Sequence, residues 1–302
     1  MLINSFLTYL QHEKRYSSHT VIAYQADLLQ FESFLQKEIE LEITQVKATH
    51  VRSFMVFLLD QNNSPNAIGR KISTLRSFYK YLLREQVLKA SPMQLIKAPK
   101  VPKRLPVFVE QEKMNDLLDG IVTEDGEVET YFTDDFAGQR DKIVMELLFG
   151  TGMRLAELLL LKETDLNTYE STIKVLGKRN KERIIPVHEP LMKLLKEYLS
   201  LKSVEKFNNK SATLIVTNTG APAYPQLIYR IVTKALKKVS TQDKRSPHVL
   251  RHSFASSLLN NGADLNAIKE LLGHASLAAT QVYTHNSVER LKSIYKQAHP
   301  KA

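Results

Sequence analysis

The stretch of sequence that decides the interpretation of this chain is Pro247-His248-Val249-Leu250-Arg251-His252, near its C-terminus. Ser246 followed by Pro247 is the pattern of a helix N-cap with proline at the first helical position, and Gly262 is the expected end of that helix. His248 and Arg251 lie three residues apart, so both face the same side of the helix. Because arginine presents a planar fork of donors that matches phosphate oxygens, this helix start is a candidate phosphate site.

Three further segments carry polar side chains that fit the same site. They are Thr151-Gly152-Met153-Arg154, Leu272-Gly273-His274-Ala275 and Val282-Tyr283-Thr284-His285. Together with the helix start, they supply two guanidiniums, one phenol and the imidazoles of His248 and His274. Fixed cations and donor imidazoles stabilise the charge that develops on a phosphate under attack, and a tyrosine hydroxyl is able to act as a covalent nucleophile. The pattern predicts a site that holds a phosphodiester while Tyr283 attacks it.

Each of these residues also has a structural interpretation when it is taken alone. Arg154 lies one helical turn before Glu157 and is a candidate for a buried ion pair with it. His252 and His285 are neighbouring histidines that the pattern does not need. The occurrence of all the segments together, in this order and with this spacing, favours the catalytic interpretation.

Length, charge and composition bound the class of protein. The chain has 302 residues, a formal net charge of +10 and a pI near 9.5, which favour a polyanionic partner without establishing one. The absence of cysteine excludes disulfides and thiolate metal sites and fits a reducing interior. The N-terminus lacks the pattern of a signal peptide, and no apolar run approaches the roughly 20 residues of a membrane span. We therefore expect a cytoplasmic protein without a membrane association.

Residues 1–96 are expected to form a helical domain. Apolar residues recur at helical spacing in four segments, with Ser17 or Ser18 as the N-cap of the second. These segments are 6–10, 18–36, 49–59 and 67–83. The last one carries bases on the face opposite its apolar residues, and these bases either are solvated or contact a DNA backbone. They are Arg70, Lys71, Arg76, Lys80 and Arg84.

Residues 97–106 contain three prolines and four bases without an acid. Proline cannot continue a helix and proline-rich segments stay extended, so this segment is the expected linker between two domains. Its bases either lie along a phosphate backbone or only keep the linker soluble. The second domain is expected to comprise residues 107–302.

The second domain is expected to be mostly helical with a small antiparallel sheet. The sheet is predicted from strands at 171–176 and 183–187 around a basic turn, with 214–216 as a third strand. An acidic loop at 124–135 is expected to face away from DNA. The expected helices are 110–118, 139–150 ended by Gly150, 155–161, one from Ser246 to Gly262, one from Asp264 to Gly273, one from Ser276 that carries Tyr283, and 288–298.

The chain resembles the tyrosine recombinases of the Xer type, which belong to the integrase superfamily of site-specific DNA recombinases. Residues 151–158 are similar to the first-arginine motif of this family, and residues 177–183 to its β-hairpin lysine motif. Residues 248–255 match the second box of the family, and residues 271–283 match the third. The resemblance extends over essentially the whole chain. It implies an N-terminal helical core-binding domain followed by a catalytic domain.

The resemblance implies roles for the residues that face the phosphate. Arg154 and Arg251 grip the non-bridging oxygens of the scissile phosphate. Tyr283 attacks phosphorus, which forms a 3′-phosphotyrosyl link and releases a 5′-hydroxyl. His274 donates a hydrogen bond to the phosphate in the transition state.

The resemblance also implies how protons move during the reaction. Lys178 protonates the leaving 5′-oxygen, although Lys181 in the same turn is a competitor for this role. His248 assists proton transfer at the nucleophile. No metal ion and no nucleotide cofactor are expected, because the arginines and histidines do the electrostatic work and the covalent link conserves the energy of the phosphodiester.

The implied partners are double-stranded DNA, a homo- or hetero-tetramer of recombinase subunits on two DNA sites, and a cell-division DNA translocase. Three interpretations of the biological role stay open: a cellular recombinase that resolves chromosome dimers, an integrase or transposase of a mobile element, and a non-catalytic DNA-binding protein of this fold. The lack of an arm-binding domain before residue 1 favours the first. The intact set of catalytic positions argues against the third.

The segment 287–302 follows the expected nucleophile and has apolar residues at helical spacing, namely Val288, Leu291, Ile294 and Tyr295. This segment either packs on its own domain or docks into a neighbouring subunit, as the resemblance implies. In the second case the partner subunit controls the position of the nucleophile, because a terminal segment with few tethering contacts is free to swap.

Overall fold

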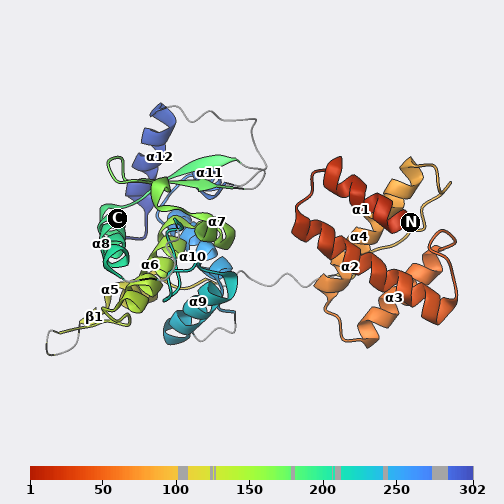
Figure 1. Ribbon diagram of the computed structural model, residues 1–302, viewed down its shortest axis with the longest axis horizontal. Helices are drawn as coiled ribbons and strands as arrows, with labels where there is room; N and C mark the ends of the chain where they lie inside the picture. The colour runs from red at the N-terminus through yellow and green to blue at the C-terminus, as the bar shows by residue number, and fades with distance from the viewer. Residues whose placement is uncertain are drawn as a thin grey trace. The chain divides into compact units, whose positions relative to one another are not determined.

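The structure is a computed structural model that describes residues 1–100, 108–122, 125, 127–177, 181–205, 207, 212–240, 244–273 and 285–301. The chain forms two compact units, Met1–Arg104 and Leu105–Ala302 (Figure 1). The division lies inside the proline-rich segment 97–106. Among the described residues, no helix combines the length and the apolar character needed to cross a bilayer. The expected fold class is confirmed, because the units are mostly helical and the second contains a small antiparallel sheet.

The N-terminal unit consists of helices that pack around an aromatic core. Serine side chains begin two of the helices, since Ser17 Oγ accepts from the backbone N–H of Thr20 and Ser64 Oγ from that of Ala67. The rings of Phe31 and Phe54 meet edge to face at 4.9 Å in the buried centre. The helices are α1 (Leu2–His12), α2 (Ser18–Phe34) with its π-helical extension η1 (Leu35–Ile39), α3 (Ala48–Asp60) and α4 (Pro65–Arg84).

Much of the basic face of α4 is bonded within the unit. The carboxylate of Asp27 is buried and accepts from Arg70 at 2.5 Å, Lys71 at 3.0 Å and Thr74 at 2.9 Å. Arg76 donates to the backbone carbonyl of Ile96 at 3.0 Å. The buried carboxylate therefore neutralises part of the charge of this face and ties α2 to α4.

The C-terminal unit is built around α6 (Phe136–Thr151), which is buried along most of its length and packs against α8, α9 and α10. Asp135 begins α6 by accepting from the backbone N–H of Gly138 at 2.8 Å. The other helices are α5 (Gln111–Asp119), α7 (Leu155–Leu160), the 3₁₀ turn η2 (Glu163–Asp165), α8 (Glu189–Val204), α9 (Pro225–Val239), α10 (Pro247–Asn260), α11 (Leu265–Leu272) and α12 (His285–Ala298).

The small sheet has the strand order β3 (Leu166–Asn167), β4 (Thr172–Leu176) and β5 (Glu182–Pro186), all antiparallel. The two expected strands are confirmed as β4 and β5, but the expected third strand at 214–216 is wrong. That segment forms only isolated bridges at its ends, Lys162 with Thr213 and Val216 with Pro222, and its apolar side chains fill the core. β3 takes the third place because a short turn joins it directly to β4.

The acidic segment expected as a loop contains a strand. β2 (Val128–Glu129) pairs with β1 (Ile121–Val122) as a short antiparallel ribbon. Two-residue strands give no alternating pattern, which is why the sequence reads as a loop there.

The expected end of α6 at Gly150 is also wrong. The helix continues to Thr151, and Gly152 adopts the left-handed conformation with φ of 60°. A β-carbon on Gly152 would lie 2.4 Å from Cδ1 of Phe254 and 2.8 Å from Cδ2 of Leu272. Gly152 therefore provides both the left-handed turn and the close approach of α10 and α11.

Helix ends nearer the C-terminus follow the sequence pattern. Asp264 caps α11 by accepting from the backbone N–H groups of Asn266 and Ala267, and Gly273 ends it with φ of 65°. α10 ends at Asn260, two residues before Gly262. The helix expected from Ser276 lies outside the described residues.

The described part of the C-terminal segment contacts its own unit. Tyr295 of α12 is buried, and its hydroxyl donates to the carbonyl of Gly150 at 2.7 Å. The His299 ring lies 4.6 Å from that of His188, and burial lowers the pKa of His188 to about 4 and that of His299 to about 3. Beyond them Lys301 pairs with Glu146 at 2.6 Å.

Candidate active site

Arg154 lies where α6 gives way to α7. Its backbone is extended, and its N–H donates to Oε2 of Glu157 at 2.8 Å while its Nη1 donates to Oε1 at 2.8 Å. The expected ion pair with Glu157 is therefore present. The side chain of Arg154 is 35% exposed, so this pairing leaves the side chain partly accessible.

Arg251 is buried on α10 and joins the ends of two other helices. It donates to the carbonyl of Gly152, which ends α6, and at 2.6 Å to the carbonyl of Leu272, the last residue of α11. Arg154 donates through Nη2 to the next carbonyl, that of Gly273, at 3.0 Å. Two segments about a hundred residues apart thus place their arginines, called the arginine clamp below, at the C-terminal end of α11.

A third arginine, Arg183 on β5, completes the cluster. Its Nη1 and Nη2 donate to Oε1 and Oε2 of Glu157, each at 2.8 Å, and its Nε donates to the carbonyl of Leu271 at 3.0 Å. Burial alone raises the pKa of Glu157, but the hydrogen bonds of Arg183 and Arg154 outweigh it and lower that pKa to about 2. The carboxylate therefore stays ionised throughout the physiological pH range.

Arg183 is not among the site residues predicted from the sequence, although the pattern of β5 indicates that it is buried and paired. The inward positions of β5 alternate as Arg183 and Ile185, both buried, between the outward Glu182 and Ile184. A charged residue at an inward strand position requires a buried partner of opposite charge. Glu157, on a short apolar helix, is such a partner.

The cluster has an excess of positive charge. Among the described residues that form it, Arg154, Arg183 and Arg251 surround the single carboxylate of Glu157. Burial, followed by repulsion from Arg154 and Arg183, lowers the pKa of Arg251 to about 10. Burial and repulsion both destabilise the charged form of Arg251. A bound anion offsets both effects, so anion binding at this cluster is favourable. Guanidiniums are not metal ligands, so this cluster is suited to a phosphate.

The hairpin that carries the lysine motif begins beside this cluster. Gly177, at the end of β4, donates to the carbonyl of Lys181 at 2.7 Å and so closes the turn. A β-carbon on Gly177 would lie 3.7 Å from both Nη1 of Arg183 and Oε1 of Glu157. The side chain of Lys181 is exposed, and the expected proton donor Lys178 lies outside the described residues.

Of the histidines and the tyrosine predicted for the site, the structure describes only His248. His248 is exposed in the first turn of α10, three residues before Arg251, and His252 is exposed as well. His274 and Tyr283 lie outside the described residues. His274 directly follows Gly273 in the sequence, and the carbonyl of Gly273 accepts from Arg154.

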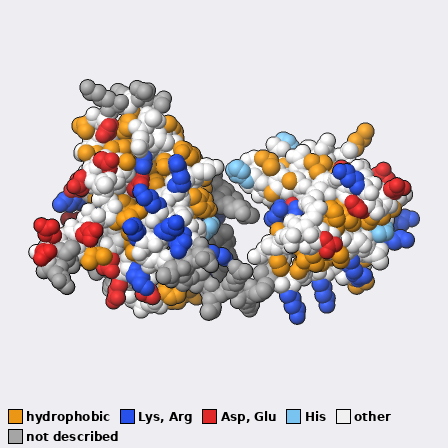
Figure 2. Space-filling view, turned by 90° about the horizontal axis from the view of Figure 1, so that it is seen from below, with side chains coloured by type: hydrophobic (Ala, Val, Ile, Leu, Met, Phe, Trp, Pro, Cys, Tyr) orange, Lys and Arg blue, Asp and Glu red, His pale blue; other side chains and the backbone are white. Residues whose placement is uncertain are grey.

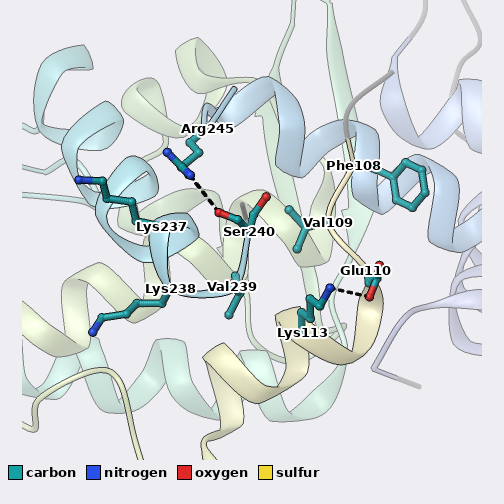
Figure 3. Close-up of a pocket in the computed structure, with 9 residues that line it drawn as sticks. All are labelled: Phe108, Val109, Glu110, Lys113, Lys237, Lys238, Val239, Ser240 and Arg245. Atoms are coloured by element: carbon teal, nitrogen blue, oxygen red, sulfur yellow. Dashed lines mark hydrogen bonds and ion pairs between the residues drawn. The ribbon is translucent and has the colours of Figure 1, made fainter. Parts of the chain in front are cut away.

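A basic pocket of about 870 Å³ lies at the approach to α10 (Figure 3). Lys237 and Lys238 extend from the end of α9 on one side, and Lys113 of α5, paired with Glu110 at 2.9 Å, lies on the other. Arg245, just before α10, donates to the carbonyl of Ser240 at 3.0 Å. The pocket therefore gathers cations beside the helix that carries His248 and Arg251.

The basic pocket continues onto α9, whose exposed face carries bases and whose sequence contains no acid. Its exposed bases are Arg230, Lys234, Lys237 and Lys238. Figure 2 views the molecule from the side on which α9 lies in Figure 1, and Lys and Arg side chains gather in the middle of this face of the C-terminal unit. Acidic side chains lie mostly toward its edge. A helix with an apolar buried face and a basic exposed face suits contact with a polyanion.

Comparison with known proteins connects both units to described families. Residues 110–290 match the phage integrase family, and residues 3–86 match the N-terminal SAM-like domain of phage integrases. The tyrosine recombinase XerC of Listeria innocua is 40% identical over 299 residues, which cover 98% of this chain and 97% of that protein. The XerC of Chlorobaculum parvum is 37% identical over 318 residues, with coverage of 99% and 94%.

Solved structures share the fold at lower sequence identity. A post-cleavage complex of the XerH site-specific recombinase with a palindromic difH substrate has a TM-score of 0.70 at 22% identity, covering 96% of this chain and 83% of that chain. The Tn1549 transposon integrase in complex with circular intermediate DNA also has a TM-score of 0.70, at 17% identity, with coverage of 96% and 98%.

Proposed function

Since the chain belongs to the phage integrase family and is a Xer-type site-specific tyrosine recombinase, we propose that the arginine clamp holds the scissile phosphate while Tyr283 attacks it. The observation that supports this most strongly is the convergence of Arg154 and Arg251 on the last carbonyls of α11. The cluster carries more cationic than anionic groups, so a phosphodiester is the ligand that balances it.

The reaction is a pair of transesterifications that conserve the number of phosphodiester bonds. The Tyr283 oxygen forms a bond to phosphorus as the bond between phosphorus and the 5′-oxygen breaks. Lys178 supplies the proton that the leaving 5′-oxygen takes up, and His248 assists removal of the proton from the tyrosine. His274 donates to the phosphate in the transition state. Attack by another 5′-hydroxyl reverses these steps and rejoins the DNA without an external energy source.

The electrostatic contribution of the arginine clamp comes from its rigidity. Arg251 is buried and held by two carbonyls, and Arg154 is held by Glu157 and Gly273, so neither cation has to reorganise when charge develops on the phosphate. Loss of one such preorganised donor typically costs about 3–4 kcal/mol of transition-state stabilisation.

Double-stranded DNA is the substrate that this family cleaves and rejoins, and the surface of the C-terminal unit suits it. We propose that the basic pocket and α9 contact phosphates next to the arginine clamp. In this proposal residues 1–96 form the core-binding domain, 97–106 a linker along the DNA backbone, and 107–302 the catalytic domain.

We infer the biological role from the names of the relatives. Two relatives named XerC align along nearly their whole length, which supports resolution of chromosome dimers in the cytoplasm rather than movement of a mobile element. The role requires a tetramer of recombinase subunits on two DNA sites, and a cell-division DNA translocase is the proposed activating partner.

The test is formation of a covalent protein–DNA adduct on a nicked substrate that traps the intermediate. Tyr283→Phe removes one oxygen, so it is expected to bind DNA normally and form no adduct, while Tyr169→Phe, at a residue 96% exposed in a surface turn, forms the adduct as the wild type does. An adduct on the Tyr283→Phe variant refutes the assigned nucleophile. DNA binding by the wild type without any adduct favours the non-catalytic interpretation instead.

A further inference from the structure

Arg183 is a buried arginine, and all three nitrogens of its guanidinium donate hydrogen bonds. Its side chain, 6% exposed, points inward from β5. Two of its nitrogens hold the two oxygens of Glu157 at 2.8 Å each, and the third donates to the carbonyl of Leu271 at 3.0 Å. Only the planar fork of arginine is able to make this set of bonds, because the lysine ammonium lacks that geometry.

The carboxylate that Arg183 holds is shared with the arginine clamp. Oε1 of Glu157 also accepts from Nη1 of Arg154, and Oε2 accepts from the backbone N–H of Arg154, each at 2.8 Å. The Arg154 side chain is one-third exposed, so its ion pair with Glu157 would hold it weakly if that pair stood alone. The buried pair with Arg183 fixes the plane of the carboxylate, and the plane of the carboxylate fixes the direction of the Arg154 guanidinium.

Arg183 also supports the last turn of α11. Carbonyl groups at a helix C-terminus lack partners within the helix. Here three consecutive carbonyls, those of Leu271, Leu272 and Gly273, accept from Arg183, Arg251 and Arg154 respectively. A β-carbon on Gly273 would lie 3.2 Å from Cδ of Arg183, so the Arg183 side chain packs directly against this turn.

We propose that Arg183 is a positioning residue for DNA cleavage: it holds Arg154 and the turn at Gly273 in the orientation that receives the scissile phosphate. The proposal rests on the proposed function, because it takes the arginine clamp as the phosphate site. Arg183 acts through Glu157 and does not itself touch DNA. If its role were only to stabilise the fold, its effect on cleavage would be independent of Arg154.

The first measurement compares cleavage with binding and stability. Arg183→Lys keeps the charge and loses the fork, so the rate of adduct formation at saturating DNA is expected to fall on the order of 10- to 100-fold. The affinity for DNA is expected to be unchanged. Arg140→Lys is the matched control, because the Arg140 side chain on α6 is also 6% exposed and bonded to Asp141 and Asn218. It is expected to cleave at the wild-type rate even where its Tm falls.

The second measurement is a double-mutant cycle on the same rate. If Arg183 acts through Arg154 and the turn whose Gly273 carbonyl Arg154 holds, the fold-loss from Arg183→Lys is smaller in the Arg154→Ala background than in the wild type. Additive losses, or a wild-type rate for Arg183→Lys, overturn the inference while the proposed function stands. A wild-type rate for Arg154→Ala overturns the proposed function instead. Should Arg183→Lys fail to fold, Arg183→Gln, which is neutral and retains an amide donor, takes its place with the same expectations.

Discussion

Replacing Gly152 by alanine tests how tightly the arginine clamp is built. The left-handed backbone at residue 152, with φ of 60°, costs an L-residue about 1–2 kcal/mol. The added methyl would also lie 2.4 Å from Phe254 and 2.8 Å from Leu272, both buried, and overpacking of this kind costs about 1–3 kcal/mol. Because these two costs add, the free energy of unfolding of the C-terminal unit is expected to fall by about 2–5 kcal/mol.

Gly262→Ala is the matched control within the same unit. Gly262 also has a left-handed φ, 85°, but a β-carbon there would have no atom within 4 Å. It therefore carries only the backbone cost, about 1–2 kcal/mol, or a decrease in Tm of about 2–8 °C for a unit of this size. Gly152→Ala is expected to lower Tm clearly further than this control.

The same change is expected to affect cleavage more than DNA binding. The carbonyl of Gly152 and that of Leu272 both accept from Arg251, so separating α10 and α11 from the turn moves the acceptors that hold this guanidinium. The assay is adduct formation at saturating DNA, well below the Tm of each variant. Equal Tm values for Gly152→Ala and Gly262→Ala, with equal cleavage rates, refute the packing argument.

Three further outcomes are expected. Lys178→Ala is rescued by a substrate with a 5′-bridging sulfur, whose thiolate leaves without a proton, whereas Lys181→Ala is affected little; the reverse pattern moves the proton donor to Lys181. Burial lowers the pKa of His188 and His299 below the unfolded value near 6.5, so the unfolded state takes up their protons first. The contribution of these two histidines to stability is therefore fully present above pH 6.5. Below that pH the free energy of unfolding falls by up to about 1.4 kcal/mol per pH unit for each histidine. Thermal denaturation between pH 7.5 and pH 5 measures this dependence, and the free energy is expected to fall less steeply with pH in His299→Gln. Truncation after Asn286 removes buried apolar residues of α12 and lowers the Tm of the isolated monomer; an unchanged Tm contradicts the packing of this helix on its own unit.

Local patterns account for most of the correct expectations from sequence. The periodicity of apolar residues predicts the helices of the N-terminal unit, and the caps at Ser17 and Asp264 are found where short polar side chains precede apolar runs. These signals involve residues within one or two turns of each other. The four motif segments likewise indicate the chemistry before their arrangement in space is known.

Contacts between distant segments explain what the sequence alone does not decide. The third strand of the sheet is β3 and not 214–216, because pairing depends on which backbone lies alongside β4. α6 passes Gly150 and turns at Gly152, because Gly152 is where Phe254 approaches.

The sequence by itself determined that two arginines, two histidines, a lysine and a tyrosine occur in the order and spacing of a phosphate-cleaving site. Only the tertiary structure decided that Arg183 and Arg154 share the carboxylate of Glu157 and that the last carbonyls of α11 hold the arginine clamp. The physical reason is that a guanidinium binds whichever acceptor the fold brings within about 3 Å of it, and that acceptor leaves no periodic trace in the sequence.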